Sequence, residues 1–275
     1  MNIYQKIFFL LLIPTCIYSQ SGLQLQKGYA DSFYLSGNLF DAITEYKRLL
    51  FFENDPEFTF EANFRIAKCY KGGGKFDDAL FTLYRLRKNT ESMEQIYKLE
   101  TEIIRLNILR GTTEQAEVLA DRLAEKFPEK QYELNYWKGW AFMTGGEWEK
   151  ASGTFALIDP SHPLKMLCDS VSADKYSVSF ARYISYILPG AGHFYTGHIL
   201  GGMISLGWNI LWGYNTVKAF NADRVFDGIM VADFLWLRFY RGGSQEAEKL
   251  AEKENLKIEN NAYRYLTNKY EGQKP

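Results

Sequence analysis

Hydrophobic and polar positions follow a helical period through the first 160 residues of the chain, and small residues recur on that pattern. In four places a glycine is followed five positions later by an alanine: Gly37 and Ala42, Gly74 and Ala79, Gly111 and Ala116, Gly146 and Ala151. The alanines lie 37, 37 and 35 positions apart. Periods in this range are typical of stacked helix pairs. The pattern therefore predicts four helical hairpins between residues 23 and 160.

The residues of each hairpin have assigned places in this pattern. The glycine fits the turn, because it tolerates backbone angles closed to other residues. The alanine allows the two helices to cross closely. The apolar face continues one helical turn later, with Tyr46, Leu83, Ala120 and Phe155, and then with Leu49, Leu86, Leu123 and Ile158.

The pattern changes after two prolines in the segment 159–163. We expect a capping helix or linker over residues 161–176, a hydrophobic domain over 177–242 and a charged, solvated helical tail over 243–275. The stretch from Ile199 to Val217 carries no formal charge, and its length is just enough to cross a bilayer core of about 30 Å. The hydrophobic domain therefore resembles a membrane segment, or a buried hairpin that imitates one.

Glycines and a proline divide this hydrophobic domain. Pro189 disfavours a helix before it, and Gly190 and Gly192 permit a tight turn. Gly197 and Gly201 lie four apart, which predicts a bare strip for close contact with another helix. The full set of residues expected to pack the domain is Pro189, Gly190, Gly192, Tyr195, Gly197, Gly201, Arg238 and Tyr240.

Four charged residues lie within the hydrophobic domain, where charge is costly. They are Arg182, Asp227, Asp233 and Arg238. We expect them to pair across the helices or to lie at an interface.

The four hairpins resemble tetratricopeptide repeats. Ala30 and Phe33 in the first unit, like Ala67 and Tyr70 in the second, match the small and aromatic positions of that family's first helix. Gly139 matches the small position in the fourth unit, whereas the third unit departs from the family's pattern. The resemblance implies an all-α fold, a helical-hairpin solenoid followed by a hydrophobic helical bundle or hairpin.

Arrays of this family usually present a concave face lined by their first helices. Its positions map here onto Lys27, Asp31, Tyr34, Phe64, Lys68, Lys71, Arg105, Tyr136, Trp140 and Met143. Basic side chains between aromatic ones suit an acidic or extended peptide. The alternative is that the aromatics cover the end of the solenoid and the lysines are solvated charges.

The hydrophobic domain resembles an uncharacterised membrane-associated domain that follows such repeats in exported bacterial proteins. The likeness rests on the segments 188–192 and 194–197 and on Arg238-Phe239-Tyr240. His193 stands where glutamine is common and Gly243 where asparagine is expected. The likeness implies membrane association and no known reaction.

The N-terminus is typical of an export signal. Lys6 precedes an apolar run, and Ser19 places a small residue before Gln20, so we expect a signal peptide over residues 1–19. A lipid anchor on Cys16 is the alternative. In the mature chain Cys69 and Cys168 remain; a disulfide would suit an oxidising compartment, but their apolar neighbours favour buried free thiols.

Composition and motifs narrow the function further. The net charge of −1 gives no indication of nucleic acid as a partner. The three histidines lack the spacing and acidic or cysteine partners of a metal site. The segment 189–192 lacks the lysine and hydroxyl of a phosphate loop. We therefore predict no catalytic residue, no metal and no cofactor.

These observations predict an exported scaffold of the cell envelope, with a periplasmic repeat domain that binds a protein or peptide and a membrane-associated C-terminal domain. One alternative is a soluble periplasmic protein whose apolar helices pack within the molecule. Another is an embedded enzyme or transport component. The sequence gives no indication of the oligomeric state.

Overall fold

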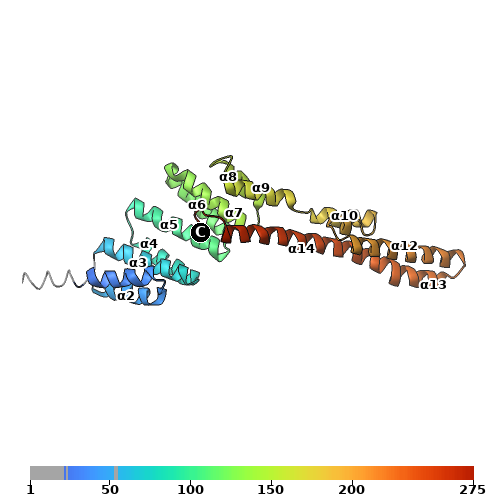
Figure 1. Ribbon diagram of the computed structural model, residues 1–275, viewed down its shortest axis with the longest axis horizontal. Helices are drawn as coiled ribbons and strands as arrows, with labels where there is room; N and C mark the ends of the chain where they lie inside the picture. Colours follow the sequence, from blue (N-terminus) through green and yellow to red (C-terminus); the bar gives the residue numbers. More distant parts are fainter. Residues whose placement is uncertain (1–21, 23, 53–54) are drawn as a thin grey trace, which may run out of the picture. The chain divides into compact units, whose positions relative to one another are not determined.

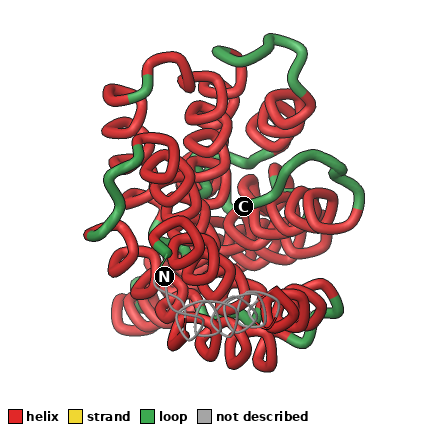
Figure 2. The backbone as a smooth tube through the Cα atoms, turned by 90° about the vertical axis from the view of Figure 1, so that its left-hand side faces the viewer, coloured by secondary structure: helices red, strands yellow, loops and turns green. Residues whose placement is uncertain are grey.

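The computed structural model describes Gly22, residues 24–52 and residues 55–275 (Figure 1). The predicted signal peptide and Cys16 lie outside the described residues. Within them the regular elements are helices, joined by loops and turns (Figure 2). The chain forms two compact units, one reaching His162 and including Lys274–Pro275, the other comprising Pro163–Gln273.

The first unit is a solenoid of helical hairpins. Its first helix covers residues 24–35. The elements that follow are α2 (Leu39–Phe52), α3 (Pro56–Gly72), α4 (Phe76–Lys88), α5 (Met93–Arg110), α6 (Thr113–Lys126), the 3₁₀ turn η1 (Pro128–Lys130), α7 (Gln131–Thr144) and α8 (Trp148–Ala156). Neighbouring helices in the chain pack against one another, which confirms the all-α solenoid expected from the sequence.

The four glycine turns adopt the backbone geometry that their residue type allows. Gly37, Gly74, Gly111 and Gly146 have φ of +79°, +71°, +81° and +81°. Such angles are costly for residues with a Cβ. The four paired alanines are fully buried where the two helices of each hairpin cross. The spacing of glycine and alanine therefore placed the turns correctly.

The interior of the repeats is formed by the predicted apolar face. The large side chains of Tyr46, Leu83 and Phe155 are buried, each in its own repeat. Cys69 is also buried there as a free thiol, and burial raises its pKa to about 11. Continuous burial from hairpin to hairpin is what stabilises a solenoid.

The second unit contains the remaining helices. They are α9 (Pro163–Asp174), α10 (Val178–Ile187), α11 (Ala191–Tyr195), α12 (Ile199–Asn221), α13 (Val225–Met230), the π-helical segment η2 (Val231–Leu237) and α14 (Arg238–Asn268). The predicted capping helix corresponds to α9, which belongs to this unit and packs against α14. Cys168 of α9 is a buried free thiol, and burial raises its pKa to about 12.

The turn between α10 and α12 is packed around two glycines. Gly190 has φ of +90°, and a Cβ there would lie 2.3 Å from the carbonyl oxygen of Gly202. A Cβ on Gly192 would lie 2.2 Å from the carbonyl oxygen of Ala181. Both distances are far below van der Waals contact, so only glycine fits at either position without rearrangement.

The predicted strip of Gly197 and Gly201 is wrong. Gly197 lies before α12 with φ of +81°, and a Cβ there would meet nothing within 4 Å. Gly201 lies on α12 and faces the ring of His193, 3.1 Å from the position its Cβ would take. The two glycines therefore do not share a helix face, because one of them ends a turn.

The charged C-terminal tail is not a separate solvated helix. It continues α14 without a break and packs against α10. Ala247 and Ala251 are fully buried. The Asn255 amide accepts a hydrogen bond from the Tyr176 backbone N–H at 2.7 Å and donates one to the Tyr176 carbonyl at 2.9 Å. The tail is therefore part of the second unit.

No helix of the described residues combines the length and hydropathy needed to cross a lipid bilayer. The sequence had left open whether Ile199 to Val217 is a membrane segment or a buried hairpin. The polar side chains of Asn209, Asn215 and Thr216 lower the mean hydropathy of α12. Many apolar side chains of this helix are nevertheless exposed, for example Leu200 and Ile210.

The charged residues of the hydrophobic domain do not pair with one another as expected. Arg182 pairs with Glu248 of α14 at 3.2 Å, and Asp227 with Arg224 at 3.1 Å. Asp233 and Arg238 make no ion pair with another described residue. Arg224 lies one helical turn from Asp227. Glu248 lies on α14, and the sequence alone does not place α14 beside α10.

Candidate functional site

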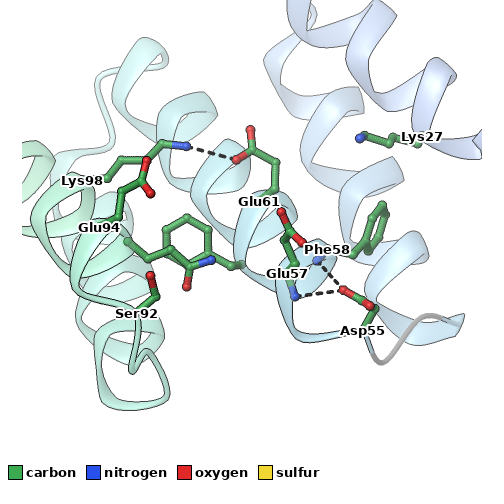
Figure 3. A pocket seen from close by; sticks show the side chains of 10 residues that line it. Lys27, Asp55, Glu57, Phe58, Glu61, Ser92, Glu94 and Lys98 are labelled. Atoms are coloured by element: carbon green, nitrogen blue, oxygen red, sulfur yellow. Dashed lines mark hydrogen bonds and ion pairs between the residues drawn. The ribbon is translucent and has the colours of Figure 1, made fainter.

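A hollow of about 740 Å³ lies in the first unit where α3 and α5 begin (Figure 3). The chain enters both helices at this end: Asp55 caps α3 by accepting hydrogen bonds from the backbone N–H groups of Glu57 and Phe58, at 2.9 and 3.0 Å. The residues that line the hollow are Lys27, Asp55, Glu57, Phe58, Phe60, Glu61, Ser92, Glu94, Gln95 and Lys98.

Carboxylates outnumber lysines in this hollow by four to two. Glu61 and Lys98 face each other from α3 and α5 and pair at 3.2 Å (Figure 3). Burial alone would raise the pKa of Glu61, but Lys98 and Arg65 hold it below its ordinary value. Glu57 and Glu94 are exposed and make no ion pair with a described residue. The hollow therefore carries negative charge that the chain itself does not neutralise.

Aromatic rings form the wall between the helices. Phe60 and Phe64 lie one turn apart on α3, with their rings stacked at 5.9 Å between centroids. The Lys98 ammonium lies 4.6 Å from the centroid of the Phe64 ring. This arrangement holds the lysine over an apolar wall. The two rings are themselves buried, with 5% and 3% of their surface exposed, so a ligand would meet chiefly the charged side chains.

A second hollow, of about 560 Å³, continues the first and shares Glu94 and Lys98 with it. Its other lining residues are Phe64, Lys68, Tyr97, Thr101, Glu102, Arg105, Phe127, Glu129, Lys130 and Glu133. The two hollows together, called the groove below, follow the faces of α3 and α5 into the fourth repeat. A surface of this form suits an extended chain.

An ion cluster forms the floor of the groove. Glu102 of α5 pairs with Lys71 of α3 at 2.8 Å and with Arg105 at 3.0 Å. Burial lowers the pKa of Lys71, and Glu102 offsets part of that effect. Burial alone would raise the pKa of Glu102, but Lys71 and Arg105 outweigh it and hold the pKa below its ordinary value. The cluster thus joins the second and third repeats.

Several residues predicted for the groove do lie in it. Lys27 lines the first hollow, and Phe64, Lys68 and Arg105 line the second. Arg105 also lies over the Trp137 ring at 4.7 Å and donates a hydrogen bond to the Lys274 carbonyl at 3.0 Å.

Three predicted residues are occupied by contacts within the repeats. Lys71 belongs to the ion cluster. Asp31 accepts a hydrogen bond from the Tyr46 hydroxyl at 2.5 Å. The Tyr34 ring lies 5.1 Å from the Arg65 guanidinium. These side chains fix the walls of the groove rather than line its hollows.

The predictions for the fourth repeat are wrong in part. Trp140 and Met143 of α7 are buried, with 4% and 0% of their surface exposed. Tyr136 is half-buried, and its ring meets those of Phe155 and His162 edge-on. An equivalent position of each repeat faces the groove only if no neighbouring side chain covers it. In the fourth repeat, neighbouring side chains cover these positions of α7.

The carboxylates of the groove were not predicted from the sequence. Glu57 and Glu94 lie in the first turns of α3 and α5. Acidic residues favour that place, because the helix dipole is positive there. The signal that could have found them is the pair of N-caps, Asp55 and Ser92, each directly before its helix.

The residues predicted to pack the second unit have mixed roles. The Tyr195 hydroxyl accepts a hydrogen bond from the Ser177 N–H at 3.0 Å, and the Tyr240 hydroxyl donates one to the Tyr186 carbonyl. Pro189 is half-buried at the end of α10, whereas Arg238 is exposed.

Among the described residues, no group of three or more His, Cys, Asp or Glu side chains is placed to hold a metal ion.

Comparison with known proteins supports the repeats. Residues 61–89 match the family model of the tetratricopeptide repeat. A search of the solved structures found two structures of nearly identical TPR-like repeats, attributed to a Podosopora anserina kinesin light chain. One, with a point substitution, has 14% identity and a TM-score of 0.43 and covers 54% of this chain and 82% of its own. The other has 11% identity and a TM-score of 0.43, and covers 91% and 98%.

A search of the curated proteins found no matching sequence. The matched segment, residues 61–89, contains α4 and most of α3, the second hairpin of the solenoid. The other hairpins share its glycine turn and its buried alanine. The first unit is therefore an array of tetratricopeptide-like repeats.

Proposed function

We propose that the protein is a scaffold whose groove binds an extended segment of a partner protein that carries a basic side chain. The proposal rests on the excess of carboxylates in the first hollow. Glu57 and Glu94 supply charge that a lysine or arginine of the partner would neutralise. The sequence pattern suggested an acidic or extended peptide, with solvated lysines as the alternative. The carboxylates of the first hollow support an extended segment that is basic.

A binding titration tests this function. Fluorescent peptides of equal length, with either two lysines or two glutamates among aromatic residues, are titrated against the full chain. We expect the basic peptides to bind more tightly, and their affinity to fall as salt rises, because exposed charges are screened. Equal affinity for both peptide classes would refute the proposal.

Matched charge reversals locate the binding site. Glu57→Lys with Glu94→Lys should weaken binding of the basic peptide by tenfold or more, since each rim charge changes sign. The control is Glu114→Lys with Glu125→Lys on α6, where both side chains are exposed and outside the groove. A control that weakens binding as much as the groove variant would show that only net charge matters.

We propose a second function for the other unit: its hairpin of α12 and α13 associates with a membrane surface. The observation behind it is the apolar exposure, which includes Leu200, Ile210, Tyr214 and Phe226, each more than 60% exposed. Exposed apolar surface on this scale is a mark of an interaction site. Leu200, Ile210 and Tyr214 fall on one broad face of α12, and Phe226 lies on α13. A helix with one exposed apolar face can lie in the plane of a membrane surface.

Vesicle flotation tests this association. Ile210→Glu with Phe226→Glu should reduce the fraction of protein that floats with phosphatidylcholine vesicles, because charge opposes burial in lipid. The control is Phe51→Glu with Phe81→Glu, equally exposed side chains of the repeats. Loss of flotation in the control alone would contradict the assignment to the hairpin.

Location in the cell envelope belongs to the same proposal. N-terminal sequencing of the protein from its own cells should give a mature chain that begins at Gln20. A chain that begins at Met1, or one with a lipid on Cys16, would refute cleavage at this site. Under the rival account, a soluble periplasmic protein, the full chain would remain at the bottom of a flotation gradient.

A further inference from the structure

Another cavity, of about 600 Å³, lies within the second unit. It lies between α11, α12 and α14. Its lining residues are His193, Gly201, Ile204, Ser205, Trp208, Asn209, Arg238, Phe239, Gly242, Gly243 and Glu246. It combines polar groups with an apolar wall, at the base of the exposed apolar hairpin.

Two helix faces meet across this cavity. Gly201, Ser205 and Asn209 are spaced by four on α12, so they lie along one face of that helix. Arg238, Gly242 and Glu246 are spaced by four on α14 and line the other side. The glycines on both faces leave room between the helices.

Buried polar atoms in the cavity wall lack partners. Asn209 is 7% exposed and His193 is 2% exposed. The Asn209 amide nitrogen donates to the Ser205 carbonyl at 2.8 Å, but its Oδ1 accepts no hydrogen bond from a described residue, and the Nδ1 of His193 has no partner among them either. A buried polar group without a partner is costly, so a ligand with hydrogen-bond donors would stabilise this wall.

Opposite charges stand at the two ends of the cavity. Arg238 is exposed and makes no ion pair with a described residue. Glu246 is exposed, and its Oε2 lies 3.7 Å from the Nε2 of His193. About 12 Å of helix rise separates the Cα atoms of Arg238 and Glu246. A ligand that carries an anionic group and a cationic group matches this pair better than one of a single charge.

We propose that this cavity binds the phosphoethanolamine group of a phospholipid. Arg238 pairs with the phosphate, as guanidinium groups commonly do. The ammonium points toward Glu246, at the end of the cavity where the Nδ1 of His193 lacks a partner among the described residues. Trp208, Phe239 and Ile204 pack against the apolar part of the lipid. The inference rests on the proposed membrane association, and it names the lipid chemistry that the second unit recognises.

The experiment compares head groups that differ in their donors. Short-chain dihexanoyl phosphatidylethanolamine, the corresponding phosphatidylcholine and free phosphoethanolamine are titrated against the full chain by calorimetry. Choline has no N–H donors, so we expect the ethanolamine lipid to bind about tenfold more tightly than the choline lipid. Equal affinity for the two lipids would overturn the proposal. Tighter binding of free phosphoethanolamine than of the lipid would assign the cavity to a soluble ligand and overturn the lipid assignment.

Variants at the exposed rim test the residues without disturbing the interior. Glu246→Gln should abolish the preference for ethanolamine, whereas Arg238→Gln should weaken binding of both lipids, because both carry the phosphate. The matched controls, Arg241→Gln and Glu252→Gln, are exposed residues of α14 outside the cavity and should retain both the affinity and the preference. A preference that survives Glu246→Gln, or an affinity that survives Arg238→Gln, would overturn the assignment.

Vesicle flotation separates this inference from membrane association itself. The unaltered chain should float more completely when phosphatidylethanolamine is added to phosphatidylcholine vesicles, and Glu246→Gln should lose that gain. If the unaltered chain floats with no vesicle yet binds the short-chain lipid, membrane association fails while the cavity assignment stands. If it floats without any preference between head groups, the cavity assignment fails.

Discussion

Replacing Glu102 by glutamine should destabilise the repeats strongly. The carboxylate pairs with Lys71 at 2.8 Å and with Arg105 at 3.0 Å, and only 5% of its side chain is exposed. Glutamine keeps the shape but removes the charge, so two neighbouring cations are left without their counter-ion. Breaking a buried pair in this way typically costs about 3–5 kcal/mol.

The matched control is Glu100→Gln on the same helix. Glu100 pairs with Arg87 at 2.8 Å, but both side chains are partly exposed, and such pairs are worth about 0–1 kcal/mol. Thermal unfolding of the full chain, followed by circular dichroism, measures the difference. We expect Tm to fall by roughly 10 °C for Glu102→Gln and by much less for the control. Equal shifts would refute the structural role of the cluster.

The same variant has a distinct pH dependence. The pKa of Glu102 is lowered in the folded state, so its stabilising effect is present above the ordinary carboxyl pKa and is lost as pH falls through the folded-state value. Acidification from neutral pH should therefore lower the Tm of the unaltered chain more than that of Glu102→Gln. A parallel decline in both proteins would contradict this assignment.

Three further predictions concern packing. Ala79→Arg should lower Tm clearly, because Ala79 is fully buried where two helices cross. Lys75→Ala in the adjoining turn should change Tm little, and equal Tm values for the two variants would contradict the repeat register. Gly192→Ala should destabilise the second unit in urea, since its Cβ would lie 2.2 Å from a carbonyl oxygen. The control is Gly207→Ala, whose Cβ would meet nothing within 4 Å. Equal midpoints of urea unfolding for the two variants would contradict the tight turn. Cys69, with its pKa raised to about 11, should react with a thiol reagent only on unfolding, and fast labelling of the native protein would refute its burial.

The repeats were predictable because their turns depend on single residues. Each turn needs a glycine at positive φ and each helix crossing needs a small residue such as alanine. Both requirements are local, so the spacing of Gly74 and Ala79 is enough to predict them. The groove was less predictable. Whether Trp140 faces solvent depends on which side chains of later helices cover it, and that is a property of packing between elements. The carboxylates of Glu57 and Glu94 come together only because α3 and α5 begin side by side.

The second unit shows the same division. A turn was correctly expected at Gly190 and Gly192. The four-residue spacing of Gly197 and Gly201 resembled a helix face, but Gly197 has positive φ and precedes the helix. The contact between α14 and α10 could not be predicted either, because the buried positions of α14 are small residues, such as Ala247, within a charged sequence. Such a face gives a weak hydrophobic pattern.

Hydrogen–deuterium exchange on the full chain, with and without the tightest-binding basic peptide, shows where the partner binds. We expect the peptide to slow exchange in α3 and α5, whose faces line the groove, and to leave exchange in α4 and α6 unchanged. Protection centred on α4 and α6, or confined to the second unit, would contradict the groove as the partner-binding site.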